Sequence, residues 1–278
     1  MNKIRLDQIG LGSYAFRYAA RKKVNPMDAV SFIEETARLG LRRALICENL
    51  NYCDCGDDYF KKIAETAGRL GITIDVGMRG YSAENIKKHI HIAGMLGAKN
   101  IRTVLGPNTE TLPKNCAEIK KDALESIGSI ADQLEKADLF LGLENHFDLT
   151  ANELADIVTR IGSKHVGFIF DSTNCIGLIE KPIDVLRMMK KNLFSVHLKD
   201  FECIKTDGGY LFNGVDMGKG SLDIDTMVNE AISCNPGACF YVEYAIYPPK
   251  GINEEELLAW EKERAAVNVA AMKKAAGL

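Results

Sequence analysis

Four polar side chains stand at or near the ends of apolar runs in the second half of the sequence. The runs "DLFLGLE", "VGFIFD", "LFSVHL" and "CFYVEY" carry Glu144, Asp171, His197 and Glu243 in turn. Carboxylates and imidazoles are costly to bury unless they are paired or bound to a metal. A single acid at a strand end is better interpreted as a hydrogen-bonded or capping group, but four such groups in succession favour a shared site.

Three carboxylates and one imidazole form a donor set of oxygen and nitrogen without a thiolate. Such a set suits Mn²⁺, Mg²⁺, Co²⁺ or Zn²⁺. Three converging carboxylates in a dry pocket would raise one another's pKa values unless a cation neutralised them. A divalent ion in such a site acts as a Lewis acid on an oxygen atom that it binds. We therefore expect one divalent ion bound by Glu144, Asp171, His197 and Glu243.

The elements that position these groups follow from an alternation of short apolar runs with longer segments of helical period. This alternation is typical of βα units and a parallel sheet. Eight strands with helices between them predict a single (β/α)8 TIM barrel over residues 1–278, whose site lies at the C-terminal strand ends. The predicted strands are 4–12, 42–48, 72–78, 100–106, 138–144, 166–171, 193–198 and 239–244.

Two of the intervening helices carry clear boundary signals. Residues 25–40 place Pro26 near the start of a helix and a glycine at its end. Residues 150–162 open with Thr150 and have Glu153 three residues later, which is the spacing of a capping box. The segment after the seventh strand, "DFECIKTDGGYLFNGVDMGKG", is interpreted as a loop.

Composition limits the class of partner. The chain has 278 residues, with 35 basic and 38 acidic residues and a net charge of −3, so it shows no electrostatic footprint for nucleic acid or an anionic membrane. No apolar run is long enough for a membrane span, and the start "MNKIRLDQIG" lacks the apolar core of a signal peptide. We expect a cytoplasmic protein with reduced cysteines and a small-molecule partner; the oligomeric state stays open, a homo-oligomer included.

Five motifs now carry a resemblance. "LGLENH", "FIFDSTN", "SVHLKD", "GKGSLDID" and "YVEY" resemble the successive signatures of the sugar phosphate isomerase/epimerase superfamily, the xylose-isomerase-like TIM barrels. The resemblance spans nearly the whole chain and implies a fold and a metal more firmly than a substrate. It implies one divalent ion at the four matching positions, with Mn²⁺ favoured, and Glu144 and Glu243 as acid and base.

The implied activity is a metal-dependent isomerase or epimerase that moves a proton through an enediolate of a sugar, keto sugar or sugar phosphate. A lyase acting on a keto sugar is the alternative, similar to inosose dehydratase or to the catalytic subunit of C-glycoside deglycosylases. A sugar-binding barrel without catalysis is an alternative of another class. Endonuclease IV is disfavoured, because the regions after Asp171 and His197 lack its additional histidines. Ketose 3-epimerases commonly carry an arginine where "ECIKTDGGY" has none.

Further residues are candidates for contacts with substrate. His146 follows Glu144 by two residues and is expected to bind a substrate hydroxyl or a metal-bound water. Lys199 follows His197 by two residues and is expected to neutralise an enediolate oxygen or bind a phosphate, with a solvated lysine as the alternative. Glu48 either reaches a hydroxyl or caps a helix.

The segments after the first two strands are polar, aromatic and long enough to cover a barrel mouth. They contain Tyr14 and Phe16 in one segment and Tyr52 in the other. Loops at this end of a barrel commonly select the substrate. We therefore predict that these two segments cover the mouth and set substrate choice, with ordinary solvated loops as the alternative. Substitution of Tyr14, Phe16 or Tyr52 by alanine is then expected to alter specificity or KM.

Overall fold

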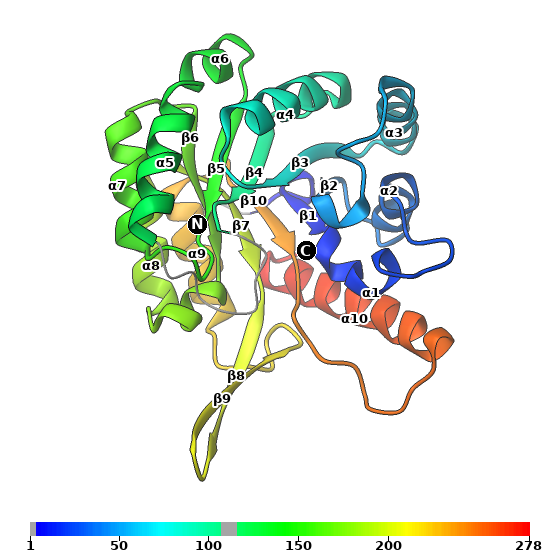
Figure 1. Cartoon of the computed structure of the whole chain (residues 1–278). Coiled ribbons are helices and arrows are strands. Elements are labelled where there is room, and N and C mark those ends of the chain that lie inside the picture. The colour runs from blue at the N-terminus through cyan, green and yellow to red at the C-terminus, as the bar shows by residue number, and fades with distance from the viewer. Residues whose placement is uncertain (1–3, 107–115) are drawn as a thin grey trace.

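The computed structural model describes residues 4–106 and 116–278 (Figure 1). Eight parallel strands of this part of the chain close into a barrel in the order β1-β10-β7-β6-β5-β4-β3-β2. The predicted (β/α)8 barrel is therefore confirmed. The barrel strands are β1 (Ile9–Gly12), β2 (Arg43–Ile46), β3 (Thr73–Arg79), β4 (Asn100–Val104), β5 (Phe140–Glu144), β6 (Val166–Asp171), β7 (Leu193–Leu198) and β10 (Cys239–Val242).

Helices surround the barrel (Figure 1). Among the helices of the described segments, none combines the length and the apolar character that a membrane span requires. The α-helices are α1 (Arg17–Ala20), α2 (Ala29–Arg38), α3 (Asp57–Leu70), α4 (Ala83–Leu96), α5 (Cys116–Gly128), α6 (Ala131–Lys136), α7 (Ala151–Ile161), α8 (Pro182–Met189), α9 (Ile224–Cys234) and α10 (Glu254–Ala275). Short 3-10 turns occupy Leu6–Gln8, Ser13–Phe16, Glu48–Leu50, Asn174–Leu178 and Lys190–Asn192.

Helix boundaries follow the local capping chemistry. At the start of α7, Thr150 accepts a hydrogen bond from the backbone N–H of Glu153, and the Glu153 carboxylate accepts one from the backbone of Thr150, so the predicted capping box is confirmed. The start of α2 differs from the prediction. Asp28 caps this helix by accepting from Ser31 N at 2.9 Å, so Pro26 precedes the helix and does not lie in its first turn.

Most strand boundaries also differ from the prediction by one or more residues, and the first and last strands are the examples that bear on the site. The first strand begins at Ile9, because Leu6–Gln8 form a 3-10 turn. The last ends at Val242, so Glu243 lies just beyond the strand. The backbone of Glu243 still donates a hydrogen bond to Leu198 O, at 3.3 Å, and this keeps it beside the end of β7.

The segment after β7 is not a loop, contrary to the prediction. Strands β8 (Asp200–Thr206) and β9 (Gly209–Val215) form an antiparallel hairpin that projects from the barrel (Figure 1). Thr206 pairs with Gly209, so Asp207 and Gly208 form the connection. Asp-Gly is a strong signal for a hairpin turn, and it was present in the sequence between two runs with β-forming residues.

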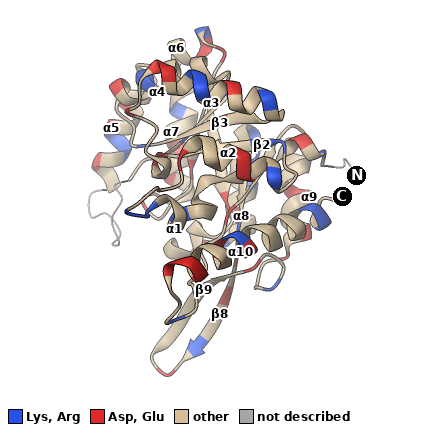
Figure 2. Cartoon of the chain, turned by 90° about the vertical axis from the view of Figure 1, so that its right-hand side faces the viewer, with Lys and Arg blue, Asp and Glu red and all other residues tan. Residues whose placement is uncertain are grey.

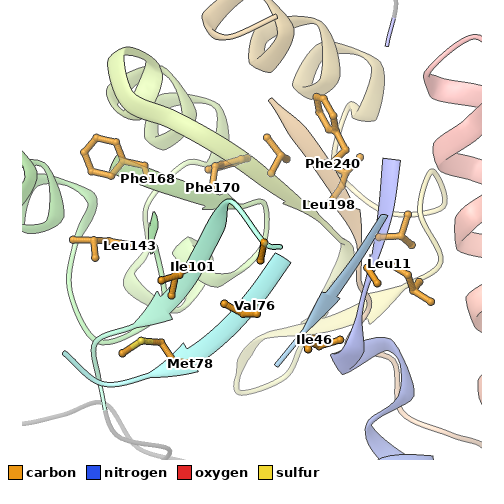
Figure 3. Close-up of a cluster of buried hydrophobic side chains, with 14 of the residues drawn as sticks. Leu11, Ile46, Val76, Met78, Ile101, Leu143, Phe168, Phe170, Leu198 and Phe240 are labelled. Carbon is orange, nitrogen blue, oxygen red and sulfur yellow. The ribbon is translucent and has the colours of Figure 1, made fainter. Parts of the chain in front are cut away.

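The barrel strands divide their side chains between two environments, as the alternation of strand residues requires. Ile46 belongs to the main core, whereas its neighbour Leu45 lies in a small separate cluster with Tyr241. Tyr241 on β10 hydrogen-bonds Asp75 on β3, and because these strands are not neighbours the contact crosses the barrel interior. Figure 3 shows main-core side chains on the strands, among them Leu11, Ile46, Val76, Ile101, Leu143, Phe168, Phe170, Leu198 and Phe240.

Candidate metal centre and barrel mouth

The four sequence-predicted ligands meet at the C-terminal ends of β5, β6, β7 and β10. All four are buried, with exposures between 0% and 2%. His197 Nδ1 lies 3.3 Å from Glu144 Oε2 and 3.7 Å from Glu243 Oε1. Ligand atoms of Glu144, Asp171 and His197 all lie within 4.8 Å of one another. We call this cluster of Glu144, Asp171, His197 and Glu243 the floor of the mouth.

The backbone of β1 leaves the space that Glu243 needs. A β-carbon at Gly12 would overlap the carboxylate of Glu243. Any larger residue there would push Glu243 away from His197. Glycine is therefore needed at position 12 because the side chain of Glu243 packs directly against the backbone there. The backbone conformation itself would not require glycine.

Two cations already contact the floor. Arg102 on β4 is buried and forms an ion pair with Glu144. Lys199 Nζ lies 2.6 Å from Asp171 Oδ2 and 3.1 Å from Glu243 Oε2. Sequence reasoning included Lys199 but missed Arg102, although an arginine inside the apolar run "NIRTVLG" was a signal that a buried partner existed. The protein therefore supplies part of the positive charge that the carboxylates require.

These charges determine the protonation of the floor. Burial alone would raise the pKa of Glu144, but the charges of Arg102 and His197 outweigh burial and hold that pKa well below its usual range. Burial lowers the pKa of His197, yet Glu144 and Glu243 outweigh it and raise the pKa above the ordinary value. Burial also opposes the charge of Lys199, but the surrounding carboxylates raise its pKa. Glu144 is consequently ionised at neutral pH.

Backbone and amide groups fix the carboxylates in place. Asp171 Oδ1 accepts hydrogen bonds from Thr173 N at 2.9 Å and Asn174 N at 3.0 Å. Asn174 Nδ2 also donates to Glu144 Oε1 at 3.1 Å. Asn145 links β5 to β6, since its amide both accepts from Asp171 N at 2.7 Å and donates to Asp171 O at 2.9 Å. The floor is therefore held by the protein before any ligand arrives.

The donor set fits a divalent cation. Within the described part of the chain, both ring nitrogens of His197 and Glu243 Oε1 are buried without a hydrogen-bond partner. Asp171 Oδ2 also lacks a hydrogen bond of good geometry, although the ammonium of Lys199 faces it. Buried polar atoms without partners are costly, and a cation held by oxygen and nitrogen atoms would satisfy them. The floor thus has the donor atoms that a divalent cation requires, with the ammonium of Lys199 beside them.

His146 and Lys199, the further candidates, both line a cavity of about 220 Å³ above the floor, together with Glu144 and Glu243. His146 Nδ1 lies 3.3 Å from Asp148 Oδ1, and its ring centroid is 3.9 Å from that of Phe147. The structure therefore places both candidates in the mouth.

The three aromatic residues of the segments predicted to set specificity have different positions. Tyr14 lines the central cavity and donates a hydrogen bond to Glu48 Oε1 at 3.0 Å. Phe16 and Tyr52 are fully buried, so their side chains do not face the mouth. Phe16 packs against Phe32 in the core, and Tyr52 donates to Gly77 O at 2.8 Å. Aromatic residues in a loop sequence were as well suited to anchoring the loop as to facing solvent.

Glu48 also lies in the mouth. It begins the 3-10 turn Glu48–Leu50 and lines a cavity next to the central one. Its Oε1 is 3.3 Å from Arg79 Nε, and its Oε2 is 3.7 Å from Arg102 Nη1. Glu48 therefore links the buried arginine of the floor to an arginine on the rim.

The central cavity continues into a second one on the side of β1, β2 and β3. This neighbouring cavity has a volume of about 450 Å³ and shares Tyr14, Arg21 and Arg79 with the central cavity. Arg17 lines the central cavity on the same side. We call the region of Arg17, Arg21 and Arg79 the arginine end of the mouth.

The central cavity also continues in another direction, toward the hairpin. The cavity there has a volume of about 340 Å³ and shares Phe147, Asn174, Lys199 and Ala245 with the central one. We call this region the aromatic end of the mouth, because its lining includes Phe147, Phe201, Phe212 and Tyr247.

The fold and the floor define a family. The family described as "Xylose isomerase-like TIM barrel" matches residues 74–264. The chain therefore belongs to the xylose isomerase-like TIM barrels, as the sequence motifs indicated. These residues hold all four side chains of the floor and both Arg79 and Arg102.

Individual proteins are similar to the chain at low sequence identity. The 3-oxo-isoapionate decarboxylase of Pectobacterium atrosepticum is 27% identical over 222 residues, which cover 79% of this chain and 78% of the relative. The crystal structure of a D-psicose 3-epimerase in the presence of D-fructose has a TM-score of 0.74 and 17% identity, covering 97% of this chain and 99% of the other. The IolI protein with a bound zinc atom has a TM-score of 0.68 and 17% identity, covering 96% and 98%. The two structural similarities show the fold.

Proposed function

We propose that the protein is a divalent-metal-dependent sugar isomerase or epimerase that moves a proton next to a carbonyl through an enediolate. The observation that carries this proposal is the floor itself: the carboxylates of Glu144 and Glu243 both lie close to Nδ1 of the buried His197, at 3.3 Å and 3.7 Å. The D-psicose 3-epimerase structure supports it at the level of the fold.

Glu144, Asp171, His197 and Glu243 would hold the ion, with Mn²⁺ as the first choice and Mg²⁺, Co²⁺ or Zn²⁺ as alternatives. The bound ion would supply Lewis-acid polarisation of the substrate carbonyl. The unpartnered atoms of His197 and Glu243 support this assignment. The zinc in the IolI protein shows that one structural neighbour holds a divalent metal.

Within the proposed acid–base pair, Glu243 is the first proton acceptor. Its Oε1 has no hydrogen-bond partner among the residues that the structure describes, whereas Arg102 and Asn174 hold Glu144. Glu144 is the other member of the pair. Because its lowered pKa keeps it ionised at neutral pH, it must first take up a proton, from a substrate hydroxyl or from solvent, before it can return one to the carbon. Lys199 neutralises charge on a substrate oxygen, and His146 orients a hydroxyl.

A second candidate, decarboxylation of a 3-oxo sugar acid, is favoured by the decarboxylase relative. In that reaction the bond between the carboxylate carbon and its neighbour breaks. The electron pair remains on the substrate as an enediolate, CO₂ leaves, and a carboxyl group of the floor protonates the carbon. Both candidates therefore use the same floor. Decarboxylation is a lyase reaction, but it differs from the dehydration and the C-glycoside cleavage that the sequence suggested as alternatives.

The test follows hydrogen at the reacting carbon. With a ketose, keto sugar or inosose in D₂O, deuterium is expected to enter the carbon beside the carbonyl, and Glu144→Gln and Glu243→Gln are expected to lower the exchange rate at least 100-fold, on the order of a lost general acid or base. Metal content is measured on every variant, and Glu65→Gln, an exposed position on α3, is the matched control. A parallel assay measures CO₂ release from 3-oxo sugar acids.

Turnover of a keto sugar without deuterium uptake would contradict proton transfer and indicate a hydride shift. Proton transfer inside a closed site would also give no deuterium uptake, and a substrate deuterated at the reacting carbon distinguishes it from a hydride shift. Both mechanisms keep the deuterium on the substrate. Only the hydride shift moves it to the neighbouring carbon without a requirement for Glu243. Binding of sugars with no turnover at all would favour a non-catalytic barrel.

A further inference from the structure

We propose that the arginine end of the mouth binds an anionic oxygen group, a carboxylate or a phosphate, and that the substrate is therefore a sugar derivative with a negative charge. This inference rests on the proposed function only in assuming that the reacting carbon lies over the floor. Arg17 and Arg21 are the residues that would bind the anion, with Arg79 beside them.

No carboxylate of the described segments forms an ion pair with Arg17 or Arg21, although the charge of Arg17 acts through space on the buried Glu261. Over the residues that the structure describes, the exposed side chain of Arg21 makes no hydrogen bond and no ion pair; only its backbone N–H donates, to Tyr18 O. Arg17 donates one hydrogen bond, to the carbonyl of Tyr244, and its guanidinium lies 5.9 Å from the ring centroid of Tyr18. Among the described residues, each guanidinium therefore retains N–H donors that make no hydrogen bond.

The other cations of the mouth are already engaged. Arg102 pairs with Glu144, and Lys199 pairs with Asp171 and with Glu243. Arg79 pairs with Glu48, at 3.3 Å, and lies at the junction of the two cavities. The surplus positive charge is thus confined to the arginine end.

This surplus is local. The whole chain carries a net charge of −3, and in the view of Figure 2 acidic and basic residues are mixed over the outer helices. Two uncompensated guanidinium groups in one concave site concentrate positive potential there and attract an anion. Guanidinium groups also match the planar arrangement of carboxylate and phosphate oxygens.

The position of the arginine end relates the anion to the chemistry. Arg17, Arg21, Glu144 and Glu243 line the same cavity of about 220 Å³, so one small molecule can contact the arginines and the floor together. An anion held by the arginines would fix which end of a sugar chain lies over Glu243. The arginine end would therefore select both the class of substrate and its orientation.

The test measures binding by calorimetry, with D-gluconate, D-glucose 6-phosphate and uncharged sorbitol as probes. We expect at least one anionic probe to bind tighter than sorbitol. Arg21→Gln and Arg17→Gln are each expected to weaken that binding on the order of tenfold, as the loss of a hydrogen bond to a charged group predicts, and to leave sorbitol binding unchanged. Arg21→Lys should retain part of the affinity because it retains the charge.

Arg69→Gln is the matched control, since Arg69 is exposed on α3 and pairs with Glu34 at 3.6 Å, away from the mouth. Arg21 has no recorded partner, so its substitution tests the inference even if the Arg17 variant folds poorly. Tighter binding of gluconate alone identifies a carboxylate site, and tighter binding of the phosphate alone identifies a phosphate site. Both results support the inference.

Three outcomes overturn it: anionic probes that bind no tighter than sorbitol, an Arg21→Gln variant with unchanged affinity for them, or an equal loss for sorbitol. The two proposals fail separately. Anion binding that depends on Arg21, without deuterium exchange on any keto sugar, overturns only the proposed function. Deuterium exchange on neutral sugars that is insensitive to Arg21→Gln overturns only the anionic substrate.

Discussion

The two ends of the mouth offer different chemistry to the same substrate. The arginine end presents Arg17 and Arg21, which have no carboxylate partner in the described segments. The aromatic end presents rings such as Phe212, which is 50% exposed, and no arginine. A charged group and an apolar face of one molecule would therefore bind at opposite sides of the floor.

The floor carries the residues of the proposed reaction, whereas the two ends of the mouth carry the residues proposed to recognise the ligand. The floor is built on strand ends and held by Asn145 and Asn174, so its geometry is set by the barrel. The two ends are built on loops, a short helix and the hairpin, elements that vary without disturbing the barrel. The chain shares its fold with the structure of an epimerase and is similar in sequence to a decarboxylase, so the fold alone does not decide the reaction.

The largest expected effect lies in the floor, which both ends share. His197→Asn is expected to weaken Mn²⁺ binding on the order of a hundredfold or more, because it removes the only imidazole of the proposed ligands. The measurement is a calorimetric Mn²⁺ titration of the metal-free protein. His91→Asn is the control, since His91 is exposed on α4.

Unchanged Mn²⁺ affinity in His197→Asn would show that the floor is not a metal site. The ion pairs of Arg102 and Lys199 would then be the permanent neutralisation of its carboxylates. The difference between the arginine end and the aromatic end would remain. Polarisation of the substrate carbonyl would then need a source other than a metal ion.

A pair of matched substitutions tests which loop residues belong to the mouth. Tyr52→Phe is expected to lower the free energy of unfolding by about 1–3 kcal/mol, because Gly77 O loses its buried donor, and to leave KM unchanged. Tyr14→Phe removes the hydrogen bond to Glu48 beside the arginine end and is expected to change KM a few-fold, with a smaller loss of stability. Urea unfolding and steady-state kinetics on both variants are the measurements.

In the reverse result, Tyr52→Phe would alter KM and Tyr14→Phe would alter stability. That result would mean that Tyr52, and not Tyr14, contacts the substrate, contrary to the positions described above. Equal effects of both substitutions on KM would show that loop anchoring and substrate contact are not separable there.

The smallest expected effect lies at the aromatic end. Phe212→Ala removes a half-exposed ring whose centroid lies 5.8 Å from that of Phe201. The substitution is expected to weaken ligand binding about twofold to tenfold. The loss should be equal for charged and uncharged ligands, since no charge is removed. Tyr210→Ala, on the same strand but outside the cavity lining, is the control.

A loss confined to anionic ligands in Phe212→Ala would break the comparison, because it would place the charged group of the ligand at the wrong end. Measuring the same probes on Arg21→Gln and Phe212→Ala therefore shows whether the two ends recognise different parts of one molecule.

The sequence by itself determined the barrel and its floor. Strand and helix periods are local properties of the chain, and the C-terminal ends of parallel strands must meet at one mouth. Glu144, Asp171 and His197 could therefore be placed together from their positions at the strand ends, and Glu243 from its place beside the last one.

Only the tertiary structure decided which other side chains reach the mouth. Arg102 meets Glu144 across 42 residues of sequence, and Arg17 meets the carbonyl of Tyr244 across 227. Phe16 and Tyr52 turn into the core, although Phe16 shares its segment with Tyr14 and Tyr52 lies in a loop that is also polar. The physical reason is that a loop side chain faces inward or outward according to the segments packed against it, and those segments are brought together only when the barrel closes.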